Sequence, residues 1–151
     1  MLERSQEEAK EWVAKAITFY TNSGKEIALA EFTNQKGPFI QDEMYIFVLN
    51  TEGNMVAHGV NEKYTGQNFI GLKDSEGKKF IREILDDANT KGSGWTDYEW
   101  YNPVTKKTMP KIVYFEKVDD LIFCSGAYIE DWLPLISYNL QFLSQRKGMN
   151  S

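Results

Sequence analysis

The spacing of three strand-like segments in the second half of the chain limits the fold more than any other feature. Residues 94–101, 109–118 and 121–128 are rich in aromatic and β-branched side chains, which is typical of strands. The first two segments are joined by the seven residues NPVTKKT, and the last two by the pair Asp119-Asp120. A crossover between parallel strands needs about a dozen residues or more. We therefore expect these three strands to be antiparallel.

An earlier hairpin adds two more strands. The segment from Met44 to Asn50 is β-rich, residues 52–54 (EGN) supply a turn, and Met55 to His58 returns. The sequence therefore predicts a five-stranded antiparallel sheet.

Helical patterns precede the hairpin. Ser5 with Glu8, and Ser23 with Glu26, each form a capping-box pattern before apolar residues at helical spacing. We expect two helices, or one helix broken at TNSG, within residues 5–34.

Two further helices complete the order of elements. Apolar residues recur at helical spacing over residues 76–91 and again over 129–146. The resulting order α-α-β-β-α-β-β-β-α, with its antiparallel sheet, indicates an α+β fold of the PAS type. Residues 1–151 are expected to form a single domain, since we find no repeat, low-complexity tract or linker.

Composition excludes several classes of partner. The net charge of −5 and a pI near 5.0 argue against nucleic acid and against an anionic membrane surface. The single cysteine rules out an internal disulfide and a cysteine-based metal cluster. The N-terminus lacks the apolar run of a signal peptide, and no stretch approaches the ~18–20 apolar residues of a spanning helix. We expect the chain to be soluble, with any membrane attachment through segments outside it.

Catalytic motifs are mostly missing. No strand is followed by G-x-G-x-x-G, and there is no G-x-S-x-G elbow. With one histidine and one cysteine, a zinc site would have to be dominated by carboxylates, which is unusual. Asp97 and Glu99 share one strand face and leave paired-carboxylate hydrolysis as an alternative. We expect no enzymatic activity, no metal and no cofactor.

Several motifs in residues 40–132 resemble a Cache domain of the single-Cache type. These motifs are the strand-turn-strand ending in Ala57-His58, the strand beginning at Gly94-Trp95, Asn102-Pro103, Pro110-Lys111 with Tyr114, and Gly126-Ala127-Tyr128. Gly59 departs from the pattern, because the family usually places proline there.

The resemblance implies a small-molecule sensor with a PAS-like fold. Such domains usually form the extracytoplasmic part of bacterial chemoreceptors and histidine kinases, and single-Cache members are similar to sensors of short organic acids. The resemblance therefore implies a periplasmic location as part of an inner-membrane receptor. In a receptor, the N-terminal helix would continue from one membrane span and the C-terminal helix would lead into another. Stand-alone members of the family also exist.

Strand alternation divides the aromatic residues between two faces of the sheet. Tyr98 and Trp100 share one face, whereas Trp95, Asp97 and Glu99 take the other. One face must pack against the terminal helices, and the other can line a pocket beneath the loop of residues 59–76. Parity alone leaves open which face forms the pocket, because a bulge near Pro110 would swap the assignment.

Lys111 is the candidate residue for binding an anion. It precedes an apolar run, and burying its ammonium without an anionic partner would be costly. A lysine whose aliphatic stem alone is buried is the alternative. His58 is the sole histidine and the one side chain whose ordinary pKa lies near neutral pH. The predicted ligand-binding residues are Tyr45, His58, Trp95, Tyr98, Trp100, Lys111, Tyr114 and Ser125.

The function predicted from the sequence is a receptor sensor domain for a short carboxylate. One alternative is an amino-acid or amine sensor that uses Asp97 or Glu99. Others are a helix-mediated dimerisation module and an acid/base hydrolase. We expect the terminal helices to lie side by side, and the isolated domain to be monomeric or weakly dimeric. The latter expectation rests on polar residues along the outer face of the first helix, namely Glu7, Lys10, Glu11 and Lys15.

Overall fold

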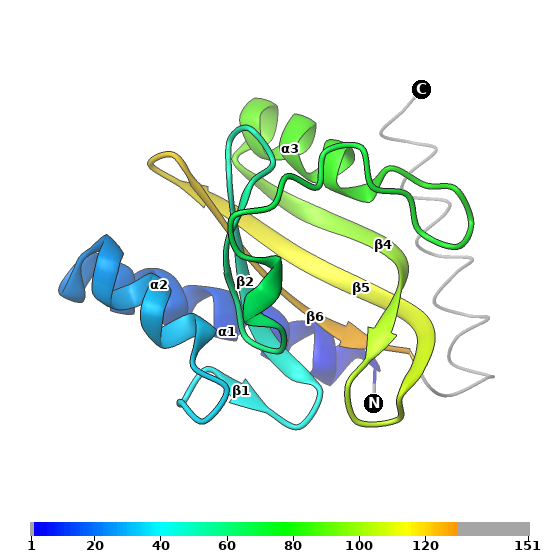
Figure 1. Cartoon of the computed structure of the whole chain (residues 1–151), viewed down its shortest axis with the longest axis horizontal. Coiled ribbons are helices and arrows are strands. Elements are labelled where there is room, and N and C mark those ends of the chain that lie inside the picture. Colours follow the sequence, from blue (N-terminus) through cyan, green and yellow to red (C-terminus); the bar gives the residue numbers. More distant parts are fainter. Residues whose placement is uncertain (1, 130–151) are drawn as a thin grey trace.

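An antiparallel sheet forms the centre of the molecule (Figure 1). The computed structural model describes residues 2–129. The principal strands are β2 (Met44–Asn50), β3 (Met55–His58), β4 (Ser93–Asn102), β5 (Lys107–Val118) and β6 (Leu121–Tyr128). They lie in the order β3-β2-β6-β5-β4, and every pairing is antiparallel. The predicted five-stranded sheet is confirmed, and a two-residue strand, β1 (Ile40–Gln41), adds to it by pairing with the start of β2.

The pairing of β4 with β5 decides which side chains share a face. The register runs without interruption from Ser93 opposite Glu116 to Asn102 opposite Lys107. Pro110 simply faces Glu99, so no bulge swaps the predicted parity.

A glycine separates the first two helices. α1 (Leu2–Ser23) ends before Gly24, and α2 (Lys25–Thr33) begins after it. Gly24 has a φ of 90°, a conformation that a β-carbon would strain. The expected break at TNSG is confirmed.

Both predicted capping boxes are wrong. Because α1 begins at Leu2, Ser5 lies within the helix and is not its N-cap. The N-cap of α2 is Gly24, and no side chain caps that end. The start of α2 is therefore set by the positive φ of Gly24, which breaks the preceding helix, and not by a capping serine hydroxyl.

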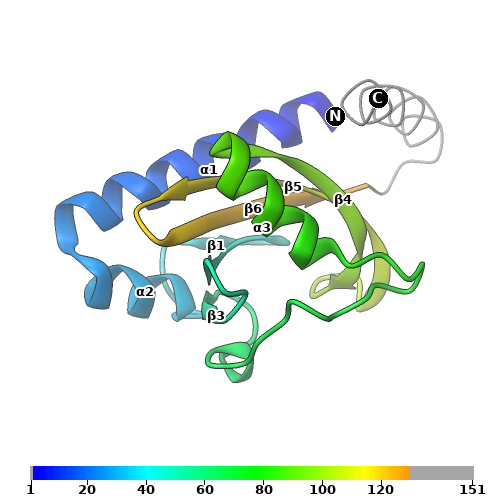
Figure 2. The same ribbon diagram turned by 90° about the horizontal axis from the view of Figure 1, so that it is seen from above.

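The helices cover opposite faces of the sheet. α1 and α2 pack on one face, where Val13, Ala16 and Phe32 meet Ile46 and Phe123. Figure 2 shows α1 lying along one side of the sheet, with the connection that contains the short helix η1 (Glu62–Tyr64) on the other side.

α3 (Phe80–Lys91) covers the other face, and it begins four residues later than predicted. The reason is a turn before it: the backbone amide of Asp74 bonds the carbonyl of Lys78, and the Asp74 carboxylate accepts from the amides of Glu76 and Lys78. The buried face of α3 consists of Phe80, Ile81, Ile84, Leu85 and Ala88.

The connection from β3 to α3, residues 59–79, passes over the α3 side of the sheet, and we name it the roof segment.

The C-terminal helix predicted over residues 129–146 lies outside the described residues. The prediction that the two terminal helices lie side by side falls outside them as well. Within residues 2–129, no helix is long and apolar enough to cross a membrane.

Candidate ligand-binding site

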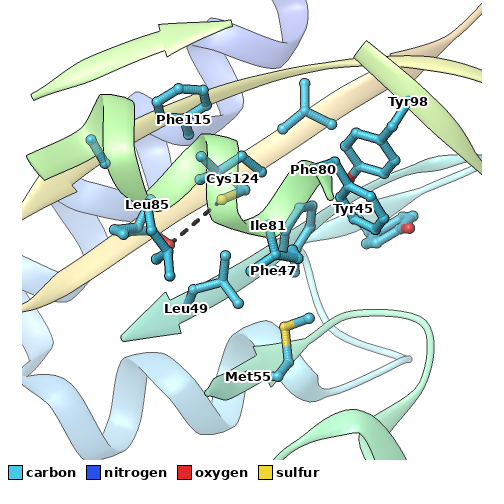
Figure 3. Packing of buried hydrophobic residues seen from close by; sticks show 14 residues of the cluster. Tyr45, Phe47, Leu49, Met55, Phe80, Ile81, Leu85, Tyr98, Phe115 and Cys124 are labelled. Atoms are coloured by element: carbon cyan, nitrogen blue, oxygen red, sulfur yellow. Dashed lines mark hydrogen bonds between the residues drawn. The ribbon is translucent and has the colours of Figure 1, made fainter. Parts of the chain in front are cut away.

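A small cavity lies between the sheet and the roof segment. It has room for about one water molecule, with about 10 Å³ open to the centre of a water-sized sphere. Figure 3 shows the rings of Tyr45, Phe80 and Tyr98 gathered at one end of the layer between α3 and the sheet. The cavity is lined by Tyr45, Phe47, Met55, His58, Phe69, Leu72, Phe80, Ile81, Tyr98 and Trp100.

Lys111 is buried beside this cavity, with 1% of its surface exposed. Its Nζ donates to the Tyr45 hydroxyl at 2.9 Å. The ammonium also lies 4.3 Å from the ring centroid of Tyr45, 5.3 Å from that of Phe47 and 5.1 Å from that of Tyr128. Cation–π contacts with desolvated ammonium groups stabilise by up to about 2 kcal/mol. Among the ion pairs of the described residues, none offers Lys111 a carboxylate.

A directed series of hydrogen bonds continues from Lys111. The Tyr128 hydroxyl donates its only hydrogen to the carbonyl of Tyr101 at 2.6 Å. Tyr128 can therefore only accept in its 3.5 Å contact with the Tyr45 hydroxyl, which in turn accepts from Lys111. The contact at 3.5 Å is long for a hydrogen bond between hydroxyls. The hydrogen of the Tyr45 hydroxyl is therefore weakly held and available to another acceptor.

His58 is buried at the end of β3 as a neutral imidazole. Its Nδ1 accepts from the backbone amides of Val60 and Asn61, at 3.2 and 3.0 Å, so the ring hydrogen resides on Nε2. Burial, and next the positive charge of Lys111, lower the pKa of His58 from 6.5 to about 3. Nε2–H makes no hydrogen bond with the part of the chain that the structure describes. His58 thus acts as a hydrogen-bond donor toward the cavity, and not as a cation at neutral pH.

Tyr98 and Trp100 form the wall contributed by β4. The Tyr98 ring stacks on Phe80 with centroids 3.9 Å apart, and Trp100 meets Phe80 edge-on at 5.5 Å. Burial raises the pKa of the Tyr98 hydroxyl, as does the neighbouring Tyr45. Between residues 2 and 129 this hydroxyl has no hydrogen-bond partner. It is a second buried donor beside the cavity.

Among the described residues that line the cavity, none carries a carboxylate. Asp97, on the other strand face, pairs with Lys78 at 3.0 Å. Glu99 shares that face, and its pKa is raised by partial burial and by the nearby Glu76, Asp74 and Asp97. The charge and the donors beside the cavity therefore favour an anion.

The structure brings together five of the eight predicted binding residues: Tyr45, His58, Tyr98, Trp100 and Lys111. The parity prediction for β4 is confirmed, since Tyr98 and Trp100 stand on the α3 side and Trp95 on the α1 side.

The other three predicted residues do not line this cavity. Trp95 and Tyr114 pack together on the α1 face, with ring centroids 5.1 Å apart. Ser125 is paired with Tyr114 and so shares that face. Its hydroxyl donates to the backbone carbonyl of Tyr45 at 3.0 Å and so helps to fix the backbone of this cavity-lining residue.

Several residues of the site were missed from the sequence. Phe47, Met55, Phe80 and Ile81 follow core periodicity, so nothing in the pattern separates them from ordinary core. Tyr128 belongs to the quoted Gly126-Ala127-Tyr128 motif, and its pairing opposite Lys111 could have been inferred from the short β5–β6 turn. Phe69 and Leu72 lie in a loop whose path no periodicity predicts.

Together, the PAS-like sheet and the buried cavity with its hydrogen-bond donors have the form of a small-molecule sensor domain. Residues 2–133 match the family described as single Cache domain 2, and the chain belongs to that family. The resemblance inferred from the sequence is confirmed.

Known proteins similar to this chain are receptors and kinases. The sensor histidine kinase MctS of Rhizobium johnstonii is 29% identical over 89 residues, which cover 58% of this chain and 19% of the kinase. This chain thus spans about a fifth of the length of that relative.

Two solved structures share the fold. One is a methyl-accepting chemotaxis protein from Vibrio parahaemolyticus (TM-score 0.74, 24% identity, 85% of this chain and 91% of that one). The other is a Cache chemosensory domain studied for carboxylic acid recognition (TM-score 0.73, 23% identity, 85% and 95% coverage).

Proposed function

We propose that this domain senses a short carboxylate for a bacterial signal-transduction or chemotaxis receptor. The observation that carries the proposal is the buried Lys111 ammonium, which has no carboxylate partner among the described residues. Desolvating an ion costs several kcal/mol in a protein interior. A bound anion would offset part of that cost.

The donors beside the cavity suggest how a carboxylate would be held. Its oxygens would accept from His58 Nε2–H, from the Tyr98 hydroxyl and from the Tyr45 hydroxyl. Lys111 lies behind Tyr45 and polarises its hydroxyl, so the positive charge acts through one intervening group. Hydrogen bonds to a charged group contribute on the order of 1.5–3 kcal/mol each.

The size and the charge of the cavity narrow the ligand further. Space for about one water favours an acid with a short tail, which Met55, Phe69 and Leu72 would surround. An amino acid or amine would bring an ammonium group next to Lys111, where none of the described lining residues offers a carboxylate to receive it. The sequence-based alternative that used Asp97 is weakened further by the pairing of Asp97 with Lys78.

The receptor context rests on the relatives. One is a sensor histidine kinase and another a chemotaxis protein. We propose that this domain likewise stands on the extracytoplasmic side of the inner membrane, as the sensing part of such a protein.

A thermal-shift panel of short mono- and dicarboxylates, amino acids and amines tests the ligand class. At about a hundred times its dissociation constant, a ligand stabilises the folded state by roughly 2.7 kcal/mol. For a domain of this size that is a Tm increase of roughly 5–11 °C. We expect short carboxylates to give this increase. No increase from any class, with protein shown to be free of carried-over ligand, would contradict the proposal.

Two lysine variants of the same strand locate the site. Lys111→Met should fold at least as stably as wild type, because an apolar side chain of similar shape replaces a buried charge. It should lose most of the carboxylate-induced Tm increase. Lys107→Met, at the exposed end of β5, is the matched control and should keep it. If both variants respond like wild type, Lys111 does not serve the site.

A further inference from the structure

The two halves of the roof segment are held in different ways. Residues 59–70 are bonded to β2 and β3 mainly through backbone groups. The amide of Gly66 bonds the carbonyl of Met55 at 2.8 Å, and the amide of Met55 bonds the carbonyl of Gln67 at 2.9 Å. The amide of Phe69 likewise bonds the carbonyl of Gly53 at 2.9 Å. This half behaves as an extension of the hairpin.

Residues 71–79 have a different attachment. Within the described residues, their backbone bonds close a local turn at Asp74, reach the adjoining Phe69 or join Lys79 to Glu83 in α3, and none reaches the sheet. The polar contacts with β4 use side chains instead. The Asp74 carboxylate accepts from the amide of Glu99 at 3.0 Å, and Lys78 Nζ bonds both the carboxylate and the carbonyl of Asp97.

Lys78 is the cation at the centre of this attachment. Its Nζ lies 3.0 Å from the Asp97 carboxylate and 3.6 Å from that of Glu83 on α3, and 20–29% of each side chain is exposed. Asp74 and Glu99 add acidic groups nearby. Partial burial, and then the neighbouring carboxylates, which include Asp74, raise the pKa of Glu99. Without Lys78, the remaining carboxylates would repel one another and favour separation of residues 71–79 from β4.

These residues also bound the cavity. Leu72 lines it directly, and Phe80 and Ile81, which follow the segment, form its α3 wall. Even the smallest carboxylate is larger than one water, so any acid has to displace part of the wall, and a longer acid displaces more of it. Strands and the backbone-bonded half of the roof segment resist displacement more than a segment held by side chains does.

We propose that residues 71–79 form the ligand entrance, and that Lys78 is a specificity-determining residue that acts from outside the cavity. By holding the segment against β4, Lys78 limits the size of the acid that enters. This inference rests on the proposed function for its ligand, and on the attachment described above for its mechanism.

Amide hydrogen exchange tests the entrance without any ligand. In Lys78→Met, the amide of Glu99, which donates to the Asp74 carboxylate, should exchange about fivefold faster, the factor that corresponds to the roughly 1 kcal/mol upper value for an exposed ion pair. Amides of residues 60–70 should be unchanged. Lys73→Met removes an exposed lysine of the same segment and is the matched control. Unchanged exchange in Lys78→Met would overturn the proposal.

Binding of acetate and hexanoate by titration calorimetry tests size selection. Wild type should favour acetate, whereas Lys78→Met should gain hexanoate affinity relative to acetate by about tenfold, and Lys73→Met should resemble wild type. An unchanged ratio in Lys78→Met would overturn Lys78 as a specificity determinant. If exchange responds as expected and wild type binds neither acid, the proposed ligand class fails, and the exchange data still support residues 71–79 as the entrance.

Discussion

Single side chains define the chemistry of this domain. Lys111 is buried with one hydrogen bond, to Tyr45, and three aromatic rings around it. His58 contributes a donor whose tautomer is set by the backbone of the roof segment. A lone histidine of ordinary pKa would suggest a pH switch, but burial removes its charge at neutral pH.

The lowered pKa of His58 predicts a pH-dependent stability. Between pH 6.5 and about 3 the unfolded chain binds one proton at this residue and the folded chain binds none, so the free energy of unfolding falls as the pH falls. Between pH 7 and pH 5 this loss is about 2 kcal/mol. His58→Asn keeps an acceptor for the two backbone amides and cannot titrate. The free energy of unfolding of this variant should therefore fall by about 2 kcal/mol less than that of wild type over the same pH interval. Urea unfolding of both proteins at pH 7 and pH 5 measures the difference, and equal pH slopes would contradict the buried neutral state.

At the scale of elements, β5 and β6 position the site through an unusually close contact. A β-carbon built on Gly126 would lie 2.4 Å from the carbonyl oxygen of Ile112 and 3.0 Å from Cε of Lys111. A glycine at this position therefore lets β6 approach β5 and leaves room for the Lys111 side chain.

Gly126→Ala should separate the two strands and displace Lys111. Overpacking of this kind costs about 1–3 kcal/mol, and we expect a loss of that size together with weaker carboxylate binding. Gly71→Ala is the control, because a β-carbon there has no neighbour within 4 Å. Chemical unfolding and calorimetry measure the two effects. A Gly126→Ala protein with wild-type stability and affinity would show that the strands are not held this closely.

At the scale of the whole molecule, one sheet serves two cores. The α3 side contains the candidate site, and the α1 side buries α1 and α2 against the other face of the same strands. α1 packs on β5 and β6, which carry Lys111 and Tyr128. The site and the long N-terminal helix therefore share their supporting strands.

The oligomeric state stays a prediction. Glu7, Lys10, Glu11 and Lys15 are all exposed on α1, which leaves charged groups where a tight helical interface would need apolar ones. We expect sedimentation at micromolar concentration to show a monomer, or a dimer that dissociates on dilution. A stable dimer under these conditions would favour the dimerisation-module interpretation instead.

The sequence by itself determined the strands, the antiparallel direction of the strands joined by short links and the parity of β4, because short links and side-chain alternation are local properties. It also indicated the family, and it singled out Lys111 and His58. Only the tertiary structure decided which strand residues face the roof segment and α3, since parity divides the residues between two faces without saying what covers each. That choice places Trp95, Tyr114 and Ser125 against α1. The partners of Lys78 and the neutral state of His58 likewise depend on contacts between residues distant in sequence, which no local pattern encodes.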